Sequence, residues 1–361
     1  MNYHALLAHF PKITYHRFKK INSYFPSLEE LWSAEINELK KAGIEEAIAD
    51  EFIEWRNNLS IDKILSTLEK EKITTISIGQ TGYPELLSQI NDPPHTLFVR
   101  GSLPKPELPL LSIVGTRHHT SYAKQVAEDL AYELAKQNIV IVSGLALGID
   151  GLVHEATLRA GGITVAVLGS SITKPEIYPA FHKNLAERII DNGSAVISEY
   201  PPGFAPTKYS FPARNRIIAG LTAGTLVIEA PIESGSLITA KAALDYNREV
   251  LAVPHPIFST QGAGTNELIK SGATLVSCAN DVIEALHLKN IQTIIENRQT
   301  LPASTPIEAE ILATLSKEPK HVDAIIKETK LESQTVNSNL VLMEMKGRVK
   351  NLGGMMYVIK F

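Results

Sequence analysis

Cysteine, long apolar runs and net positive charge are all scarce in this chain. Its single cysteine, Cys278, excludes an intramolecular disulfide and a cysteine-based zinc cluster. The start of the chain lacks the apolar core of a secretory signal, and no apolar stretch is long enough to span a bilayer. A formal net charge of -4 means that any basic surface for nucleic acid must be local. We therefore expect a cytoplasmic protein with no membrane partner.

Motifs for nucleotide and metal binding are also missing. The chain has no GxxxxGK(S/T) phosphate loop, and the turn from Gly144 to Gly148 does not complete a GxGxxG dinucleotide pattern. Metal-ligand spacing is absent as well. Asp150 and His154 lie four residues apart on a predicted helix, and without a nucleophile we interpret them as structural. We expect no cofactor, no metal and no catalytic residue.

The length of 361 residues, with 44% hydrophobic and 20% charged residues, indicates a globular chain of two or three domains. The first domain, rich in apolar residues at helical spacing, is expected to bind DNA backbone or a partner protein, or to act as a packing cap. The predicted segments are a helical domain of the SAM or helix-hairpin-helix type at 1–60, an extended Rossmann-like DNA-binding domain at 61–288 with its core at 110–286, a linker at 289–305, and a winged helix at 306–361.

Short, β-branched apolar runs alternate with amphipathic helices from Leu110 to about Leu286. Such runs are typical of strands buried on both faces, and strands separated by helices form right-handed crossovers. The pattern predicts an α/β fold with a Rossmann-like, doubly wound, mostly parallel sheet. The strands are expected at 110–114, 139–142, 163–168, 194–198, 224–228, 249–253 and 273–276.

Small and polar residues follow several of these strands, where the next helix begins. The clearest groups are Gly115-Thr116-Arg117, Ser143-Gly144 and Ser234-Gly235-Ser236. Helix N-termini carry unpaired N–H groups and partial positive charge, so several of them on one sheet edge can bind phosphates. Arg117 can add a bidentate phosphate contact or can satisfy strand-end carbonyls instead. An ordinary helix cap is the alternative role for the two serines at 234 and 236.

A second basic segment runs from Pro206 to Ile218 and interleaves cations with aromatic rings. Cations that hold a backbone and rings that stack on unpaired bases are what a single-strand groove requires. We expect Lys208 to bind phosphate and Phe211 to stack on a base. The DNA-binding residues predicted from this segment are Lys208, Phe211, Arg214, Asn215 and Arg216. Alternatively, the two arginines pair with Glu199 and Glu229 at neighbouring strand ends.

The sequences of these motifs and their order along the chain resemble those of the DNA-processing protein A family, also called Smf. The resemblance rests on Val114-Gly115-Thr116-Arg117, on the segments 143–150 and 211–220, and on Ser234-Gly235-Ser236-Leu237-Ile238-Thr239-Ala240. It implies a non-enzymatic homodimer that binds incoming single-stranded DNA during natural transformation, protects it, and loads the recombinase RecA onto it. It also implies DNA-binding roles for Arg117, Lys208 and Phe211.

Two positions depart from the family's pattern. Some relatives carry a DNA-binding lysine where this chain has Ala180, and Lys174 or Lys183 are candidates to replace it. His255 stands where a glycine commonly follows the proline, so a different local turn is expected there.

For the predicted winged helix at 306–361, the sequence is compatible with either DNA or a protein as the partner. Its presumed recognition helix, 333–346, carries Gln334, Asn337 and Asn339 for base contacts, but only one cation. Backbone contacts are expected, if at all, from Lys346, Arg348 and Lys350. We favour a protein-contact or regulatory role over duplex binding as a transcription factor.

A rival interpretation of the sheet domain is a nucleotide-processing enzyme of the phosphoribohydrolase type. Its nearest motif is Gly262-Ala263-Gly264-Thr265-Asn266-Glu267, and Glu229 or Glu267 would carry the reaction. The dimer surface is expected among exposed apolar residues, with Leu251, Ile257, Phe258 and Ile269 as candidates.

Overall fold

A computed structural model describes residues 1–288, 305–316, 319–346 and 348–359. The chain divides into two compact units, Met1–Lys289 and Asn290–Phe361, and each is described by itself. The linker predicted at 289–305 lies outside the described residues, except for Thr305.

The first unit begins with a cluster of short helices, as the sequence predicts. Phe10, Phe52 and Trp55 form its aromatic core, with ring centroids 5.2–5.7 Å apart. Phe18 stacks on His95 at 5.0 Å and so attaches the cluster to the residues before β2. The elements are α1 (Tyr3–Leu7), α2 (Tyr15–Tyr24), α3 (Leu28–Ser33), α4 (Ile36–Lys41), α5 (Glu46–Asn58) and α6 (Ile61–Lys70).

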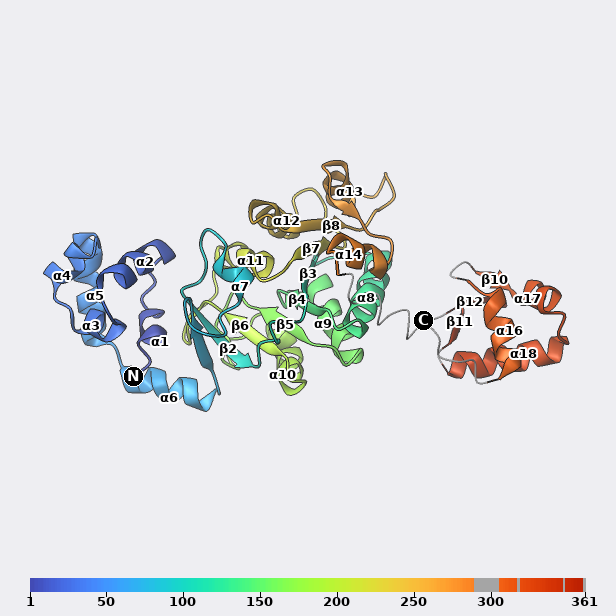
Figure 1. The fold of residues 1–361 in the computed structure, drawn as a ribbon, viewed down its shortest axis with the longest axis horizontal. Coiled ribbons are helices and arrows are strands. Elements are labelled where there is room, and N and C mark those ends of the chain that lie inside the picture. The colour runs from blue at the N-terminus through green and yellow to red at the C-terminus, as the bar shows by residue number, and fades with distance from the viewer. Residues whose placement is uncertain (289–304, 317–318, 347, 360–361) are drawn as a thin grey trace. The chain divides into compact units, whose positions relative to one another are not determined.

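A sheet of nine strands, counted within the described ranges, forms the rest of this unit (Figure 1). Its order is β1-β2-β6-β5-β4-β3-β7-β8-β9, in which the pairs β1–β2 and β2–β6 are antiparallel and the other pairs are parallel. The predicted mostly parallel, doubly wound sheet is therefore confirmed. The strands are β1 (Thr74–Ser77), β2 (Thr96–Gly101), β3 (Leu110–Val114), β4 (Val140–Ser143), β5 (Thr164–Val167), β6 (Ala195–Ser198), β7 (Gly224–Val227), β8 (Glu249–Ala252) and β9 (Thr274–Leu275).

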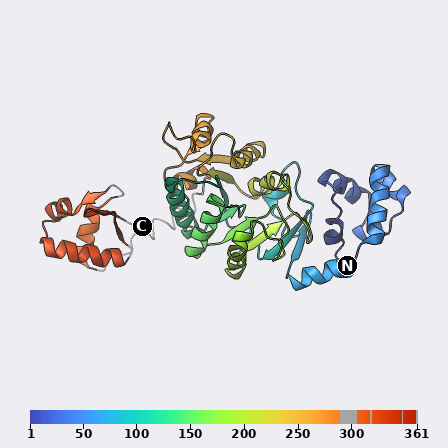
Figure 2. The same ribbon diagram turned by 180° about the vertical axis from the view of Figure 1, so that it is seen from behind.

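Helices cover both faces of the sheet because successive strand residues point to opposite sides. Val165 and Val167 of β5 pack under α11, whereas Ala166 packs under α10. Figures 1 and 2 show the layers from the front and from behind. The elements are α7 (Glu85–Ser88), α8 (Ser121–Lys136), α9 (Ile149–Arg159), η1 (Ala180–His182), α10 (Lys183–Asp191), α11 (Ser210–Gly220), α12 (Gly235–Asp245), α13 (Ala263–Lys270) and α14 (Ala279–Ala285).

The parallel strands β3 to β8 all end at the same side of the sheet. We call this side the carboxyl edge and define it by the segments that follow the strands. These segments are 115–120, 144–148, 168–182, 199–209, 228–234 and 253–262. Ligands of open α/β sheets bind beyond this edge, so it is the natural place for a functional site.

The second unit is a winged helix, in agreement with the sequence. Helices α16 (Pro306–Thr314), α17 (Val322–Thr329) and α18 (Ser333–Met345) enclose a core that includes Ile311, Ile325 and Leu340. Its antiparallel sheet has the order β10-β12-β11. The strands are β10 (Lys320–His321), β11 (Val349–Asn351) and β12 (Met356–Ile359). In neither unit does a helix within the described residues combine the length and apolarity needed to cross a membrane.

Candidate nucleic-acid interface

Arg117 lies exposed at the carboxyl edge, between β3 and α8. The preceding Thr116 is buried, and its N–H donates to the carbonyl of Glu229 at 2.8 Å. Gly148 has φ +83°, and a Cβ there would lie 2.5–2.7 Å from backbone atoms of Thr116 and Arg117. The glycine thus lets the loops after β3 and β4 pack closely, and Arg117 lies exposed in the loop that leads into α8.

The turn after β4 is folded around the carboxylate of Asp150, in the first turn of α9. Gly144 N and Ala146 N donate to Oδ2 of Asp150 at 3.0 and 3.4 Å. Ser143 is fully buried, and its hydroxyl donates to the carbonyl of Ile113 at 2.7 Å. The N–H group of Gly144 and the hydroxyl of Ser143 thus have partners within the protein, which favours structural roles over the predicted direct DNA contacts.

Arg214 is also an internal residue. Its Nη1 donates to the carbonyl of Gly144 at 2.6 Å and to the carbonyl of Val167. A Cβ at Gly144 would lie 2.5–2.6 Å from the guanidinium, which explains the glycine. Burial lowers the pKa of Arg214 to about 10, and burial raises the pKa of Asp150 although the Arg214 charge opposes that shift. Arg214 therefore joins the ends of β4 and β5, which favours a structural role over the predicted DNA contact.

Arg216 forms the ion network that the sequence left as the alternative. Its Nη2 lies 2.6 Å from Oε2 of Glu199, and its Nε lies 3.4 Å from Oδ2 of Asp92. Glu229 is not part of this network, since its two carboxylate oxygens accept from the N–H and hydroxyl of Thr120 at 2.8 and 2.7 Å. The geometry of Arg216 thus favours an intramolecular role over a phosphate contact.

Lys208 is exposed at the end of the segment between β6 and α11. Its Nζ lies 5.0 Å from the ring centroid of Tyr209, a cation–π contact. Phe211 is half-buried; it packs on Gly169, where a Cβ would come within 2.9 Å of the ring, and its centroid lies 5.3 Å from that of Tyr178. The lysine and the ring therefore lie at the carboxyl edge, as predicted, with the lysine free to meet a phosphate.

The turn Ser234-Gly235-Ser236 lies at the carboxyl edge, where α12 begins. Ser234 is the N-cap, and its Oγ accepts from Ser236 N at 3.3 Å and lies 2.7 Å from the Ser236 hydroxyl. Gly235 is exposed, with nothing within 4 Å of a Cβ placed there. Asn215 Nδ2 donates to the carbonyl of Gly235 at 3.2 Å. The ordinary cap is thus present, and Gly235 leaves open space above the helix N-terminus.

Three aromatic residues of this region are exposed, and the sequence analysis assigned none of them a site role. Tyr178, Phe181 and Tyr209 are 48%, 82% and 72% exposed, respectively. Each follows a parallel strand on the side where Lys208 lies. Exposure of an aromatic ring cannot be read from its sequence neighbours.

The lysines considered as replacements at the exposed Ala180 position are both engaged. Lys174 Nζ lies 3.0 Å from Oε2 of Glu187, and Lys183 Nζ donates to the carbonyl of Pro175 at 2.7 Å. His255, the other departure, is built into its turn: Asn266 accepts from its N–H and donates to its carbonyl, each at 3.0 Å.

The groups considered for catalysis have structural partners. His154 is fully buried, its Nδ1 lies 2.7 Å from Thr164 Oγ1, and burial lowers its pKa to about 3. Glu229 is fully buried, whereas Glu267 is exposed and lies 3.8 Å from Lys270. Within the residues that the structure describes, no group of three or more His, Cys, Asp or Glu side chains is placed to hold a metal ion.

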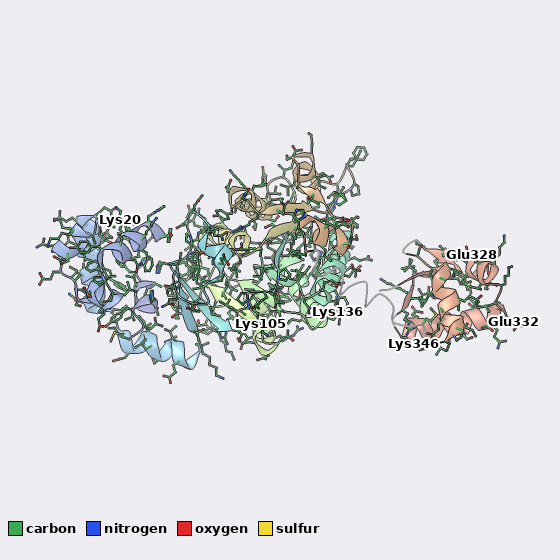
Figure 3. The ribbon with its side chains drawn as sticks, viewed as in Figure 1. Lys20, Lys105, Lys136, Glu328, Glu332 and Lys346 are labelled. Carbon is green, nitrogen blue, oxygen red and sulfur yellow. The ribbon has the colours of Figure 1, made fainter. Side chains whose placement is uncertain are left out.

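In the winged helix, two of the cations expected to bind a DNA backbone form ion pairs with a buried glutamate. Lys346 (labelled in Figure 3) and Arg348 lie 2.5 and 2.9 Å from the carboxylate of Glu308, which is 1% exposed. The amides of Asn337 and Asn339 donate to the carbonyls four residues earlier on α18. The base-reading and phosphate-binding groups expected here are thus largely occupied within the unit.

Comparison with known families gives two matches in chain order. The family described as DNA recombination-mediator protein A matches residues 74–287, and the DprA winged helix domain matches residues 296–355. Protein Smf of Escherichia coli (strain K12) is 35% identical over 321 residues, which cover 88% of this chain and 85% of that protein. The DNA processing protein DprA of Bacillus subtilis (strain 168) is 40% identical over 238 residues, which cover 64% of this chain and 77% of that protein.

Two solved structures are also similar. The X-ray structure of DNA processing protein A from Streptococcus pneumoniae aligns with a TM-score of 0.67 and 34% identity, covering 79% of this chain and 97% of that one. DNA processing protein A from Helicobacter pylori, described for its single-stranded DNA binding mode, aligns with a TM-score of 0.52 and 31% identity, covering 63% and 97%.

Proposed function

The chain belongs to the DNA recombination-mediator protein A family, and on this premise we propose that it binds single-stranded DNA at the carboxyl edge of its sheet. The observation that carries the proposal is the pair of exposed cations at this edge, Arg117 and Lys208, next to exposed aromatic rings. Cations that track a backbone and rings that stack on bases bind single strands with little sequence preference. The single-stranded DNA binding mode described for the Helicobacter pylori relative supports the same ligand.

In this mechanism the guanidinium of Arg117 and the ammonium of Lys208 bind phosphates, while Phe211 stacks on an unpaired base. Gly115, Thr116 and the turn Ser234-Gly235-Ser236 contribute backbone surface beside two helix N-termini. A duplex keeps its bases stacked inside, so the rings gain nothing from it. The protein should therefore prefer single strands.

Fluorescence anisotropy with a labelled oligothymidylate and a duplex of equal length tests this preference. The expected result is binding of the single strand at protein concentrations that leave the duplex free. Equal affinity for both would contradict the proposal. A sequence series of equal length serves as the control, because stacking and backbone contacts should give similar affinities throughout.

We further propose that the protein protects incoming single strands in the cytoplasm during natural transformation and loads RecA onto them. The support is family membership together with a surface that holds DNA without consuming it. The test is RecA ATPase activity on single strands coated with single-strand-binding protein. The expected result is a shortened lag with the wild type and an unchanged lag with Arg117→Ala. A lag that the wild type leaves unchanged would contradict loading.

A homodimer is part of the same proposal, and the turn after β8 supplies the candidate surface. Ile257 and Phe258 are 85% and 93% exposed, whereas Leu251 is fully buried and cannot contribute. Ile269 is half-buried. Sedimentation should show a dimer for the wild type and a monomer for Phe258→Asp, because a charge in an apolar interface costs desolvation energy. A monomeric wild type would contradict the assignment.

We propose no catalytic activity and no cofactor. Of the two carboxylates considered for the enzymatic alternative, that of Glu229 is buried and accepts hydrogen bonds from Thr120. That of Glu267 is exposed and lies 3.8 Å from the ammonium of Lys270. A nucleotide-release assay with nucleoside monophosphates should show no turnover. Turnover that is lost in Glu229→Gln or Glu267→Gln would favour the phosphoribohydrolase alternative.

For the winged helix we propose a protein contact rather than duplex binding. Two of its cations face the buried Glu308, while Val341 and Leu342 on α18 are 51% and 50% exposed. A chain that ends before Thr305 should retain its single-strand affinity. Loss of that affinity would assign the DNA site to the winged helix.

A further inference from the structure

A groove of about 350 Å³ lies at the carboxyl edge, on the β5 and β6 side of Lys208. It is formed by the segments 175–183 and 203–206, which follow these two neighbouring strands. Tyr178 and Phe204 contribute its aromatic lining, and Pro206 lies among its apolar residues. The volume is at the lower end of the range for small-ligand sites, so the groove suits a single planar group.

The groove is continuous with the DNA surface proposed above. Tyr178 lines the groove, and its ring centroid lies 5.3 Å from that of Phe211, the residue proposed to stack on a base. Pro206, at the other side, precedes Lys208 by two residues. A strand held by Lys208 and stacked on Phe211 therefore has its next nucleotide beside Tyr178.

The charge next to the groove favours an aromatic base over a phosphate as its ligand. The carboxylate of Glu176 lines it and accepts from Thr173 Oγ1 at 2.5 Å and from Gly203 N at 3.0 Å. A phosphate next to this carboxylate would be repelled, whereas an aromatic base would not. Lys183 also lines the groove, but its Nζ donates to the carbonyl of Pro175 at 2.7 Å. The exposed Lys208 lies outside the lining and favours phosphate, so the backbone should follow the outside of the groove.

The walls are held in place before any ligand arrives. Phe204 stacks on Tyr200 with ring centroids 4.1 Å apart and an interplanar angle of 13°. Gly203 has φ +89°, a conformation that glycine adopts without strain. Phe204 N also donates to the carbonyl of Pro201 at 3.1 Å. A site with fixed walls loses little conformational entropy on binding.

We propose that this groove binds one unpaired base of the DNA strand, adjacent to the nucleotide on Phe211, with Tyr178 as its stacking face. This inference rests on the proposed single-strand binding. It adds a second base site, in which an exposed tyrosine has a ligand role. The site binds through ring stacking, so it should accept any of the four bases.

An abasic scan tests the proposal. Oligothymidylates of the shortest length that binds with full affinity, so that the strand has a single register, each carry one abasic residue, moved stepwise along the strand, and are titrated against the full chain. For the wild type, two neighbouring positions should be sensitive, each losing about 5- to 100-fold in affinity, as expected for one lost base–aromatic stack. Phe211→Ala should abolish the sensitivity of one position, and Tyr178→Ala should abolish that of its neighbour.

Three further variants make the assignment specific. Tyr178→Phe keeps the ring and should retain the wild-type profile. Ala205→Leu fills the groove without altering the contact between Tyr178 and Phe211, and should abolish the same sensitivity as Tyr178→Ala. Tyr132→Ala removes a half-buried tyrosine from the far end of α8 and should change nothing. 2-Aminopurine at the groove position should be quenched by the wild type and by Tyr178→Phe, but not by Tyr178→Ala.

The outcomes separate the two proposals. A wild type with one sensitive position, or a Tyr178→Ala profile identical to that of the wild type, would overturn the base groove and leave single-strand binding intact. A wild type that does not bind single strands would overturn the proposed function itself.

Discussion

The variant Arg214→Met tests whether Arg214 stabilises the fold or contacts DNA. The guanidinium lies in the interior, donates to two strand-end carbonyls, and offsets the charge of the buried Asp150. Methionine keeps much of the volume but removes the charge and all the donors. The variant therefore leaves a buried carboxylate without its compensating cation and two carbonyls without a donor.

The magnitude follows from these losses. Each buried carbonyl left without its donor costs about 1–3 kcal/mol, and loss of the charge that favours the ionised form of the buried Asp150 adds to this. We expect Arg214→Met to lower the free energy of unfolding by at least about 3 kcal/mol. The double variant Asp150→Asn with Arg214→Met should recover part of this loss, because it no longer buries an unpaired charge.

The pH dependence has a defined sign. Burial raises the pKa of Asp150 in the folded state, so ionising it costs stability as the pH rises. Without Arg214 this pKa rises further. The deficit of Arg214→Met should therefore be larger at pH 8 than at pH 5.

Urea unfolding followed by far-UV circular dichroism is the appropriate assay, since Trp32 and Trp55 both lie in the N-terminal helices and their fluorescence reports only locally. A loss below about 1 kcal/mol, together with a large fall in single-strand affinity, would refute the reasoning. That result would return Arg214 to the list of DNA contacts.

Three other predictions concern the described residues. Burial lowers the pKa of His154 to about 3, so the unfolded chain binds the proton more tightly than the folded protein does. As the pH falls from 6 to 4, this residue should lower the free energy of unfolding by about 1.4 kcal/mol per pH unit. Urea titrations at several pH values test this, because the free energy of unfolding of His154→Gln should depend less on pH than that of the wild type. Gly144→Ala places a methyl group against the Arg214 guanidinium and should cost about 1–3 kcal/mol, whereas Gly235→Ala points into open space and should leave thermal stability unchanged; equal melting temperatures for the two variants would contradict the packing argument. Glu308→Gln removes the charge shared by two cations and should make residues 305–359 more sensitive to limited proteolysis while single-strand affinity stays constant; resistance equal to the wild type would show that the ion cluster adds no stability.

Most of the fold could be predicted because parallel strands buried on both faces leave an unambiguous signal. Continuous β-branched runs such as Val140–Ser143 occur at regular intervals, and the helices between them leave right-handed crossovers as the only common topology. The last strand is shorter than predicted, with two residues, Thr274–Leu275, in place of four. Edge strands have fewer ladder partners, so their ends are poorly determined by sequence.

The candidate site was predicted only in part, since sequence shows which side chains are charged but not which are buried. Arg117 and Lys208 lie exposed at the expected edge. Arg214 and Arg216 stand in an equally basic motif, yet they bind Gly144, Val167 and Glu199 inside the protein. Arginine at a strand end satisfies carbonyls as readily as phosphates, so composition alone cannot separate the two roles.

The central claim is that Arg117 and Lys208 bind DNA phosphates, and a salt series tests it most directly. Single-strand affinity is measured from low to high salt for the wild type, Arg117→Ala, Lys208→Ala and Lys105→Ala. Lys105, labelled in Figure 3, is an exposed lysine before β3 and away from the carboxyl edge, so it controls for net charge. Each site variant should lower the slope of log affinity against log salt by about 0.7, the value for one lost single-strand phosphate contact, while Lys105→Ala keeps the wild-type slope. Folded site variants with the wild-type affinity and slope would contradict the account.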